Sequence, residues 1–358
     1  MKVNGVPTRS IWSTDDGQAL VIIDQNQLPY RFETQELRTW QQVQKAIAQM
    51  SVRGASLVGI AGAWAMVLAM KEVQDDEGIH RVRSALIATR STPANLQWGV
   101  DKIVSHVLAF APHERFVAGV KYAERLTQAN VIANRAIGEH GAKIIAQIYA
   151  QTREPVNILT HGDPGWLGTV DYGTALSPVY IAFEQGIPLH VWVDETRPRN
   201  QGLLTSWELS QVGVPHTVIA DNAAGVLMQQ RLVDLVLIGA ARITKAGDVA
   251  AKVGTYLKAL AAKDMDVPIY AAGSSACIDW SIADGRHEIE IERRDPEEVR
   301  YIQGLNEQGE LERLQILSSD INVENPAFDI TPARLLTGII TERGLCQAER
   351  LSDLYELE

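Results

Sequence analysis

From about residue 156 onward, short apolar runs rich in strand-forming residues alternate with helical patterns, and this alternation constrains the fold more than any other feature of the sequence. Strands are expected at residues 156–160, 189–193, 216–219, 235–238 and 268–271, and helices at 174–184, 203–212, 222–231 and 248–263. Such alternation is typical of a parallel sheet covered by helices on both faces. The second half is therefore predicted to be Rossmann-like. No GxGxxG pattern follows a strand, so a dinucleotide site is not indicated.

The first half of the chain has a different pattern. Residues 21–24 and 30–32 predict a small β element, and helices are expected at 40–50, 57–73 and 95–110. Residues 112–152 contain few helix breakers and are expected to form helices that bridge the two halves. We therefore predict an α/β protein with two domains. Residues 1–125 form a mainly helical N-terminal domain with a small sheet, and residues 126–358 form a Rossmann-like parallel-sheet C-terminal domain that starts with the bridging helix.

Charge, cysteine content and hydropathy exclude several classes of function. The chain has 33 Lys+Arg against 44 Asp+Glu, and its net charge of -11 disfavours nucleic-acid binding. Two cysteines, Cys277 and Cys346, cannot form a disulfide framework or a thiolate zinc site, and the eight histidines show no metal-ligand spacing, so no metal is expected. The longest apolar run, residues 57–70, is too short to span a membrane, and the N-terminus lacks a secretory pattern. A cytoplasmic protein without membrane or nucleic-acid partners is expected.

Polar segments follow each expected strand, where open α/β sheets bind their ligands. These segments are residues 161–165, 194–202, 221–222, 239–242 and 273–275. Each can also be an ordinary turn, because Gly, Asp, Asn and Ser are common in turns. The segment 194–202 is the exception, since its several charged groups lie between apolar elements and need partners. We expect Asp194 or Glu195 to be buried and paired with Arg197, Arg199 or Arg242.

A second candidate site precedes the apolar helix of the first half. A helix N-terminus presents free N–H groups, so Gly54 and Ala55 are able to approach a phosphate while Arg53 supplies a cation. The alternative is an exposed arginine before a core helix. Arg90 is a weaker candidate of the same kind.

Several motifs together resemble the 5-methylthioribose-1-phosphate isomerase family, whose superfamily also contains ribose-1,5-bisphosphate isomerases and the regulatory subunits of initiation factor 2B. They are RGA at 53–55, YGTAL at 172–176, DETRPRNQG at 194–202, GDV at 247–249 with KVGTY at 252–256, and NPAFDITP at 325–332. The resemblance runs nearly end to end. It implies a homodimer in methionine salvage that needs no cofactor and converts an aldose 1-phosphate to a ketose 1-phosphate. It also implies that Arg53, Gly54, Ala55, Arg90, Gln201 and Lys252 bind the sugar phosphate.

The sequence departs from the family where the chemistry is expected. Gly162 replaces the cysteine of the family's THCNxG motif, and Ala241 replaces the aspartate of its GADR-type motif. Ala251 replaces a substrate-contacting asparagine. Because glycine and alanine carry no acid, base or nucleophile, we expect reduced or altered turnover. Asp163 is a possible substitute acid or base, and its alternative is a turn residue before Pro164.

The sequence is consistent with two interpretations of function. One is an isomerase-type protein that binds a ribose 1-phosphate analogue and turns it over slowly. The other is an inactive or re-purposed protein that binds the sugar phosphate and regulates a partner. Both place Arg53, Arg90, Gln201 and Lys252 around one concave site. Both also expect Gly162 and Ala241 to face each other across that site, with no other thiol close by.

Overall fold

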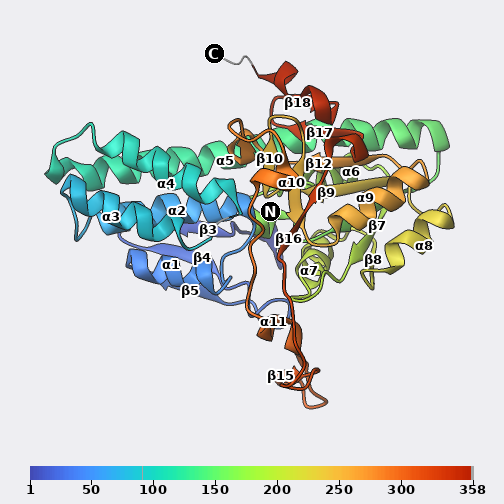
Figure 1. The fold of residues 1–358 in the computed structure, drawn as a ribbon, viewed down its shortest axis with the longest axis horizontal. Coiled ribbons are helices and arrows are strands. Elements are labelled where there is room, and N and C mark those ends of the chain that lie inside the picture. The colour runs from blue at the N-terminus through green and yellow to red at the C-terminus, as the bar shows by residue number, and fades with distance from the viewer. Residues whose placement is uncertain (91, 356–358) are drawn as a thin grey trace.

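The computed structural model describes residues 1–90 and 92–355. A helical half and a half built on a large sheet lie side by side, and the long helix α5 runs along both of them (Figure 1). Among the described residues, no helix is long and apolar enough to cross a membrane.

The large sheet has seven strands in the order β18-β17-β12-β9-β6-β7-β8. Its strands are β6 (Val156–His161), β7 (Leu189–Asp194), β8 (His216–Ile219), β9 (Leu235–Gly239), β12 (Ile269–Ala272), β17 (Gly338–Thr341) and β18 (Gly344–Cys346). All neighbours pair in parallel except β17 and β18. The five expected strands and the Rossmann-like architecture are confirmed. The strand order reverses between β6 and β9, which is where such sheets bind ligands.

The parallel strands from β6 to β12 are connected by the helices α6 (Ser177–Glu184), α7 (Gly202–Val212), α8 (Ala223–Gln229) and α9 (Thr255–Asp264). The expected helix 248–263 is wrong in its first part. Residues Val249–Lys252 form strand β11, which pairs with β10 (Arg242–Thr244) and β16 (Phe328–Thr331), and β10 pairs in turn with β13 (Ile278–Asp279). Gly247 and Gly254, with φ of +87° and +104°, separate this strand from its flanks. The four strands form a second sheet that sequence reasoning missed.

The small sheet of the first half consists of β3 (Ile11–Ser13), β4 (Leu20–Ile23) and β5 (Thr34–Leu37), and β1 (Lys2–Val3) pairs with β2 (Val6–Pro7). The expected strand at 30–32 is wrong. The backbone N–H groups of Tyr30 and Arg31 both donate to the carbonyl of Gln27, so this stretch is a turn and the strand begins only at Thr34.

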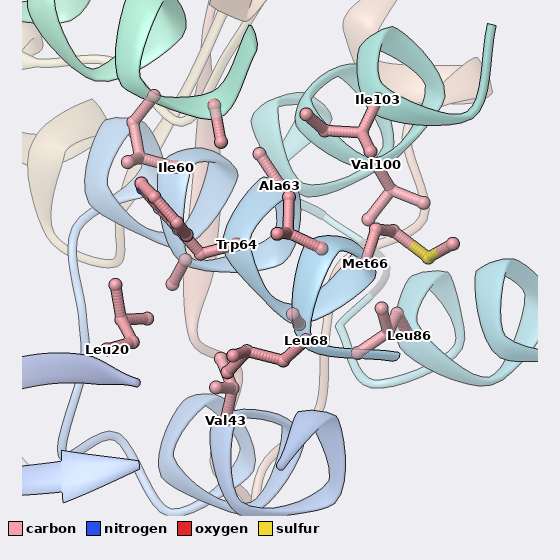
Figure 2. Close-up of a cluster of buried hydrophobic side chains, with 14 of the residues drawn as sticks. Leu20, Val43, Ile60, Ala63, Trp64, Met66, Leu68, Leu86, Val100 and Ile103 are labelled. Atoms are coloured by element: carbon pink, nitrogen blue, oxygen red, sulfur yellow. The ribbon is translucent and has the colours of Figure 1, made fainter. Parts of the chain in front are cut away.

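The helical half is built around α2 (Ala55–Ala69), in which every residue after Ala55 is buried. Its neighbours are α1 (Trp40–Ala48), α3 (Asp76–Ile87) and α4 (Ala94–Val107), and side chains from all four helices and β4 meet in one core (Figure 2). The expected helices 40–50, 57–73 and 95–110 correspond to α1, α2 and α4, whereas α3 was not expected. The α2 and α4 backbones come very close, because a Cβ on Gly99 would lie 2.0 Å from the carbonyl oxygen of Gly59.

The bridging segment is one helix, α5 (Arg115–Thr152), after a short 3-10 turn at Pro112–Glu114. Its first half contributes Ala123, Leu126 and Val131 to the core of the helical half. From Ile137 onward its buried side chains belong to the core around the large sheet. We propose a division into residues 1–125 and 126–358. The buried side chains of α5 pass from the core of the helical half to the core around the large sheet between Val131 and Ile137, inside this helix. Residues 356–358 of the second domain lie outside the described part of the chain.

The last part of the chain returns between the two halves. It contains α10 (Gly285–Glu288), α11 (Glu297–Arg300) and the hairpin of β14 (Tyr301–Leu305) and β15 (Leu311–Gln315), which projects from the body of the molecule (Figure 1). Short 3-10 turns lie at Trp166–Gly168, Ser275–Cys277, Ala333–Leu335 and Ala348–Leu354.

The contact between α2 and α4 gives a prediction about stability. Gly99→Ala should lower the free energy of unfolding by about 1–3 kcal/mol, since the added methyl group forces the two backbones apart. Gly225→Ala is the control, because a Cβ at this position of α8 meets nothing within 4 Å. Denaturant unfolding of both variants measures the difference. Equal stability of the two variants would contradict the tight packing described here.

Candidate functional site

A cavity lies at the carboxyl edge of the large sheet, where the strand order reverses. Its walls come from the ends of four neighbouring strands and the segments that follow them. They include Gly162 and Asp163 after β6, Arg199 and Gln201 after β7, Gly239 at the end of β9 with Ala240 and Ala241 after it, and Gly273, Ser274 and Cys277 after β12. The cavity therefore lies where the topology predicts a ligand.

The N-terminus of α2 reaches this cavity from the helical half. Gly54, Ala55 and Ser56 line it, and the first N–H groups of the helix are available to an anion there. Gly54 has a φ of +89°, and a Cβ on it would lie 2.3 Å from the Cα of Gly168. Only glycine fits this position, because both the backbone conformation and the close approach exclude a side chain.

Eight of the ten predicted site residues line the cavity. They are Gly54, Ala55, Arg90, Gly162, Asp163, Gln201, Ala241 and Lys252. They come from both halves of the molecule, so the expected concave site between the halves is present. Whether each of them binds substrate stays a prediction.

Arg53 and Ala251 do not line the cavity. The guanidinium of Arg53 donates to the carbonyls of Met50 and Gln25 and to Oδ1 of Asn26, and it faces a second, neighbouring cavity. Ala251 is buried in the core, because successive residues of β11 point to opposite faces and Lys252 takes the face toward the cavity. The expectation that Arg53 joins the other cations is therefore wrong for its side chain.

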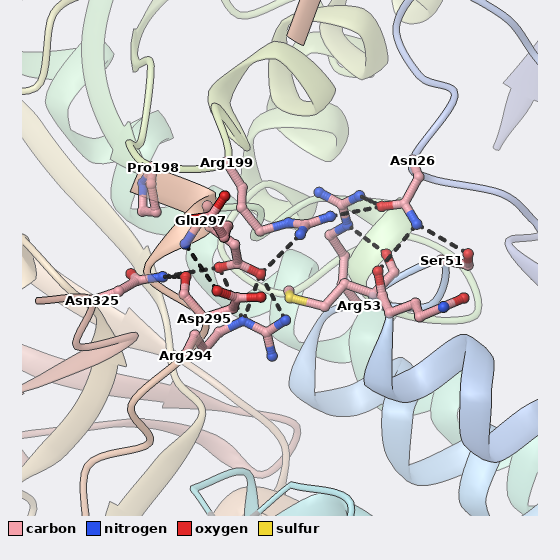
Figure 3. Close-up of polar contacts among 12 residues, drawn as sticks. Asn26, Ser51, Arg53, Pro198, Arg199, Arg294, Asp295, Glu297 and Asn325 are labelled. Carbon is pink, nitrogen blue, oxygen red and sulfur yellow. Dashed lines mark hydrogen bonds and ion pairs between the residues drawn. The ribbon is translucent and has the colours of Figure 1, made fainter. Parts of the chain in front are cut away.

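A chain of charged side chains runs from the cavity wall to Arg53 (Figure 3). Arg90 pairs with Glu292 at 3.1 Å, and Arg294 joins Glu292 at 3.0 Å to Glu298 at 2.8 Å. Arg199 pairs with Glu298 at 3.0 Å and donates to Oδ1 of Asn26, which Arg53 also uses.

These pairs shift the ionisation of their members. Burial acts to raise the pKa of Glu298, but the hydrogen bonds and charge of Arg294 and the charge of Arg199 lower it to about 2. Burial and the charge of Arg199 lower the pKa of Arg53 to about 9. Sequence reasoning missed Arg294, which lines the cavity. Its partners Glu292 and Glu298 are close to it in the chain, but the contact that joins this segment to the helical half, Arg90 with Glu292, spans 202 positions.

Asp194 is fully buried, as expected, but its partners are not arginines. It pairs with Lys258 of α9 at 2.9 Å and with Nδ1 of His161 at 3.0 Å. The three expected partners are engaged elsewhere: Arg197 donates to backbone carbonyls, Arg199 pairs with Glu298, and Arg242 pairs with Asp279. Asp194 is the last residue of β7, and Lys258 near the start of α9 reaches it there.

His161, Asp194 and Asp221 bring possible metal-ligand atoms within 4.8 Å of one another. The ammonium of Lys258 already supplies a cation to Asp194. Both oxygens of Asp221 accept backbone N–H groups, from Thr196 and Arg197. Nε2 of His161 faces the carbonyl oxygen of Val253 at 2.8 Å. The chemistry of this cluster is that of an internal ion-pair network beneath the cavity.

Three polar side chains in the cavity have unused hydrogen-bonding capacity. Gln201 donates to Oδ1 of Asp163 at 3.2 Å, which leaves Oδ2 of Asp163 and Oε1 of Gln201 buried without a partner in the described chain. No hydrogen bond or ion pair within the described residues reaches the ammonium of Lys252. Burial lowers the pKa of Lys252 to about 8. Such groups indicate a ligand-binding site.

The expectation that no thiol lies near the site is wrong. Cys277 lines the cavity, because it follows β12 and β12 is the neighbour of β9. Its Sγ donates to the carbonyl of Ser274 at 2.9 Å, and burial raises the pKa of the thiol far above its usual range. This thiol is a neutral group under ordinary conditions. Its place after the fifth expected strand was the signal that could have located it.

Glu208 holds the loop that carries Asp163. Its carboxyl accepts the backbone N–H groups of Trp166 and Leu167 at 2.7 and 3.2 Å and the hydroxyl of Tyr180 at 2.8 Å. Burial raises the pKa of Glu208 to about 8. A Cβ on Gly165 would lie 1.8 Å from this carboxyl, so the loop passes directly over it.

Comparison with known proteins agrees with this geometry. The sequence pattern of the Initiation factor 2 subunit family matches residues 51–348, and the chain belongs to that family. It is 49% identical over 352 residues to a protein named methylthioribose-1-phosphate isomerase from Gluconobacter oxydans, with 97% of this chain and 96% of the relative covered. The family resemblance predicted from the motifs is confirmed.

Two solved structures share the whole fold. The 5-methylthioribose 1-phosphate isomerase from Pyrococcus horikoshii has a TM-score of 0.82 at 34% identity, with 98% of this chain and 97% of that chain covered. The subunit delta of translation initiation factor eIF-2B from A. fulgidus has a TM-score of 0.76 at 34% identity, with 97% and 98% covered. One of these proteins is named as an enzyme and the other as a translation factor, so the fold alone does not decide the function of this chain.

The buried carboxyl of Glu208 predicts a pH dependence of stability. Its pKa rises from 4.5 to about 8 on folding, so the folded chain holds this proton more tightly than the unfolded chain. The stabilisation is complete below about pH 4.5 and is lost as the pH rises through about 8. We expect this group to lower the free energy of unfolding by at most about 5 kcal/mol across that window, at about 1.4 kcal/mol per pKa unit.

Chemical unfolding between pH 4.5 and 8.5 measures this effect. Glu208→Gln cannot titrate and should show a flatter pH dependence than the unmodified protein. Glu184→Gln, at an exposed position of α6, is the control and should keep the full dependence. An unchanged pH dependence in Glu208→Gln would show that the carboxyl is already ionised in the folded protein.

Proposed function

We propose that this protein binds a 5-substituted ribose 1-phosphate in the cavity and isomerises it slowly to the ketose 1-phosphate. The observation that carries the proposal is the lining of the cavity. The N-terminus of α2, the guanidinium of Arg90 and the ammonium of Lys252 surround one space and offer it N–H groups and positive charge. The relatives named as methylthioribose-1-phosphate isomerases support this substrate class.

The reduced rate follows from the two family positions that hold Gly162 and Ala241. Because the anomeric oxygen of the substrate carries the phosphate, the ring cannot open to a free aldehyde without an acid at the ring oxygen, and a second group must act at C1 and C2. A positioned acid or base contributes typically ~10²–10⁴-fold to rate. Gly162 and Ala241 line the cavity without supplying such a group.

The second candidate function is a protein that binds the sugar phosphate and regulates a partner. The same two residues favour it, since the anion-binding groups are present while the family's acid and base are absent. Saturable binding without product is its signature. For either function we propose a homodimer located in the cytoplasm, with no nucleic-acid or membrane partner.

Restoring the family residues tests the proposal. We expect Gly162→Cys with Ala241→Asp to raise the rate of ketose 1-phosphate formation from 5-methylthioribose 1-phosphate by about 10²–10⁴-fold, because both missing groups return. The matched control is Gly162→Ser with Ala241→Asn, which has similar size but no thiol or carboxyl. Calorimetric binding and thermal unfolding are measured on each protein, since Gly162 has a φ of +86° that disfavours any side chain.

The outcomes separate the two candidates. Slow turnover by the unmodified protein supports the isomerase. Tight binding without product, at any enzyme concentration, favours the regulatory protein. Failure of the unmodified protein to bind a ribose 1-phosphate would contradict both.

A further inference from the structure

The proposed reaction needs proton transfer, and the cavity contains a small set of groups able to perform it. The titratable side chains that line it are Arg90, His161, Asp163, Arg199, Lys252, Cys277 and Arg294. Most of them already have a partner within the protein. The three arginines form ion pairs with Glu292 or Glu298.

His161 and Cys277 also have hydrogen-bond partners within the protein. Both ring nitrogens of His161 lie at hydrogen-bond distance from acceptors, at 3.0 Å from Asp194 and 2.8 Å from the carbonyl of Val253. The thiol of Cys277 donates to the carbonyl of Ser274. In this arrangement neither group has a proton free for a substrate, because both ring nitrogens of His161 face acceptors and the S–H of Cys277 is donated to a backbone carbonyl.

Lys252 and Asp163 remain. Lys252 lies beside the position that the family gives to a cysteine, since its Cβ would be 3.5 Å from a Cβ on Gly162. The small residue at 162 therefore leaves space next to the lysine side chain. One carboxylate oxygen of Asp163 is buried without a partner. Within the described residues, no hydrogen bond or ion pair reaches the ammonium of Lys252. Both side chains are thus available to a bound ligand.

We propose that Lys252 and Asp163 form a proton-transfer pair that carries the residual isomerisation in place of the family's cysteine and aspartate. This inference rests on the proposed function. It gives Lys252 a role in the reaction beyond holding the phosphate.

The steps balance with these two groups alone. The Lys252 ammonium protonates the ring oxygen as the bond from that oxygen to C1 breaks. The Asp163 carboxylate takes the proton from C2, and the C–H electron pair forms the C1–C2 double bond of an enol. The proton on Asp163 then moves to C1 while the Lys252 amine takes the proton of the C2 hydroxyl, which leaves a C2 carbonyl and restores both groups.

The charges around Lys252 suit this role. Burial lowers the pKa of Lys252 to about 8, Arg294 and Arg199 act in the same direction, and Asp163 and Glu298 oppose them. An amine with a pKa near 8 can both give and accept a proton near neutral pH, whereas an ordinary lysine stays protonated.

Lys252→Arg tests the inference, because arginine keeps the positive charge for the phosphate but does not titrate near neutral pH. We expect binding of ribose 1-phosphate to change by less than about tenfold and turnover to fall by about 10²-fold or more. Lys245→Arg, the same change at an exposed turn, is the control and should leave turnover unchanged. Asp163→Asn should reduce turnover at every pH.

A second measurement needs no turnover. The rate at which a small anhydride acylates Lys252, followed by mass spectrometry of the peptide, should reach half its maximum near pH 8, and ribose 1-phosphate should protect the amine. Full turnover in Lys252→Arg, or acylation that titrates as in an ordinary lysine, would overturn this inference and leave the proposed function standing. Absence of turnover in the unmodified protein over the whole pH range, with binding intact, would overturn the isomerase and the inference together.

Discussion

Strands β6 and β9 pair in parallel, and the chain leaves them in opposite directions across the sheet, from β6 to β7 and from β9 to β12. This divergence opens a space between the segments that follow the two strands. Gly162 and Ala241 lie at these two strand ends, and Gln201 and Cys277 follow the next strand on either side. The sheet topology thus determines which residues can meet in the cavity, and residue type then determines the chemistry available there.

The row of ion pairs from Arg90 to Arg199 joins the sheet to the helical half at the same cavity. Its carboxylates, Glu292 and Glu298, belong to the returning C-terminal segment, whereas Arg90 comes from the helical half and Arg199 from the sheet. Removing one member of a buried pair leaves an uncompensated charge, which is strongly destabilising. The same contacts therefore hold the two halves together and place guanidinium groups at the cavity. Arg53 contributes at one remove, through the Asn26 oxygen that it shares with Arg199.

The main sheet and most of the cavity could be predicted from the sequence, for physical reasons that also explain the failures. The five parallel strands are apolar runs bounded by turn residues, and their ends determine where Gly162, Gln201 and Ala241 lie. Residues 249–252 were expected to be helical because alanines favour a helix, whereas pairing with β10 and β16 makes this segment a strand. The long-range pairs were not predictable, since nothing local to Asp194 selects Lys258 over a neighbouring arginine. Arg294 was missed because the contact that joins its segment to the helical half, Arg90 with Glu292, is also long-range.

The left-handed backbone at Gly162 has a consequence for how this site changes over evolutionary time. A residue other than glycine in this conformation costs roughly 1–2 kcal/mol, so a single codon change to cysteine would bring a stability defect together with the thiol. The hydrogen bonds of Gly162 with the hydroxyls of Thr196 and Thr205 fix that backbone further. A thiol at this position would therefore come without a loss of stability only if the residues that hold the loop in this conformation changed as well.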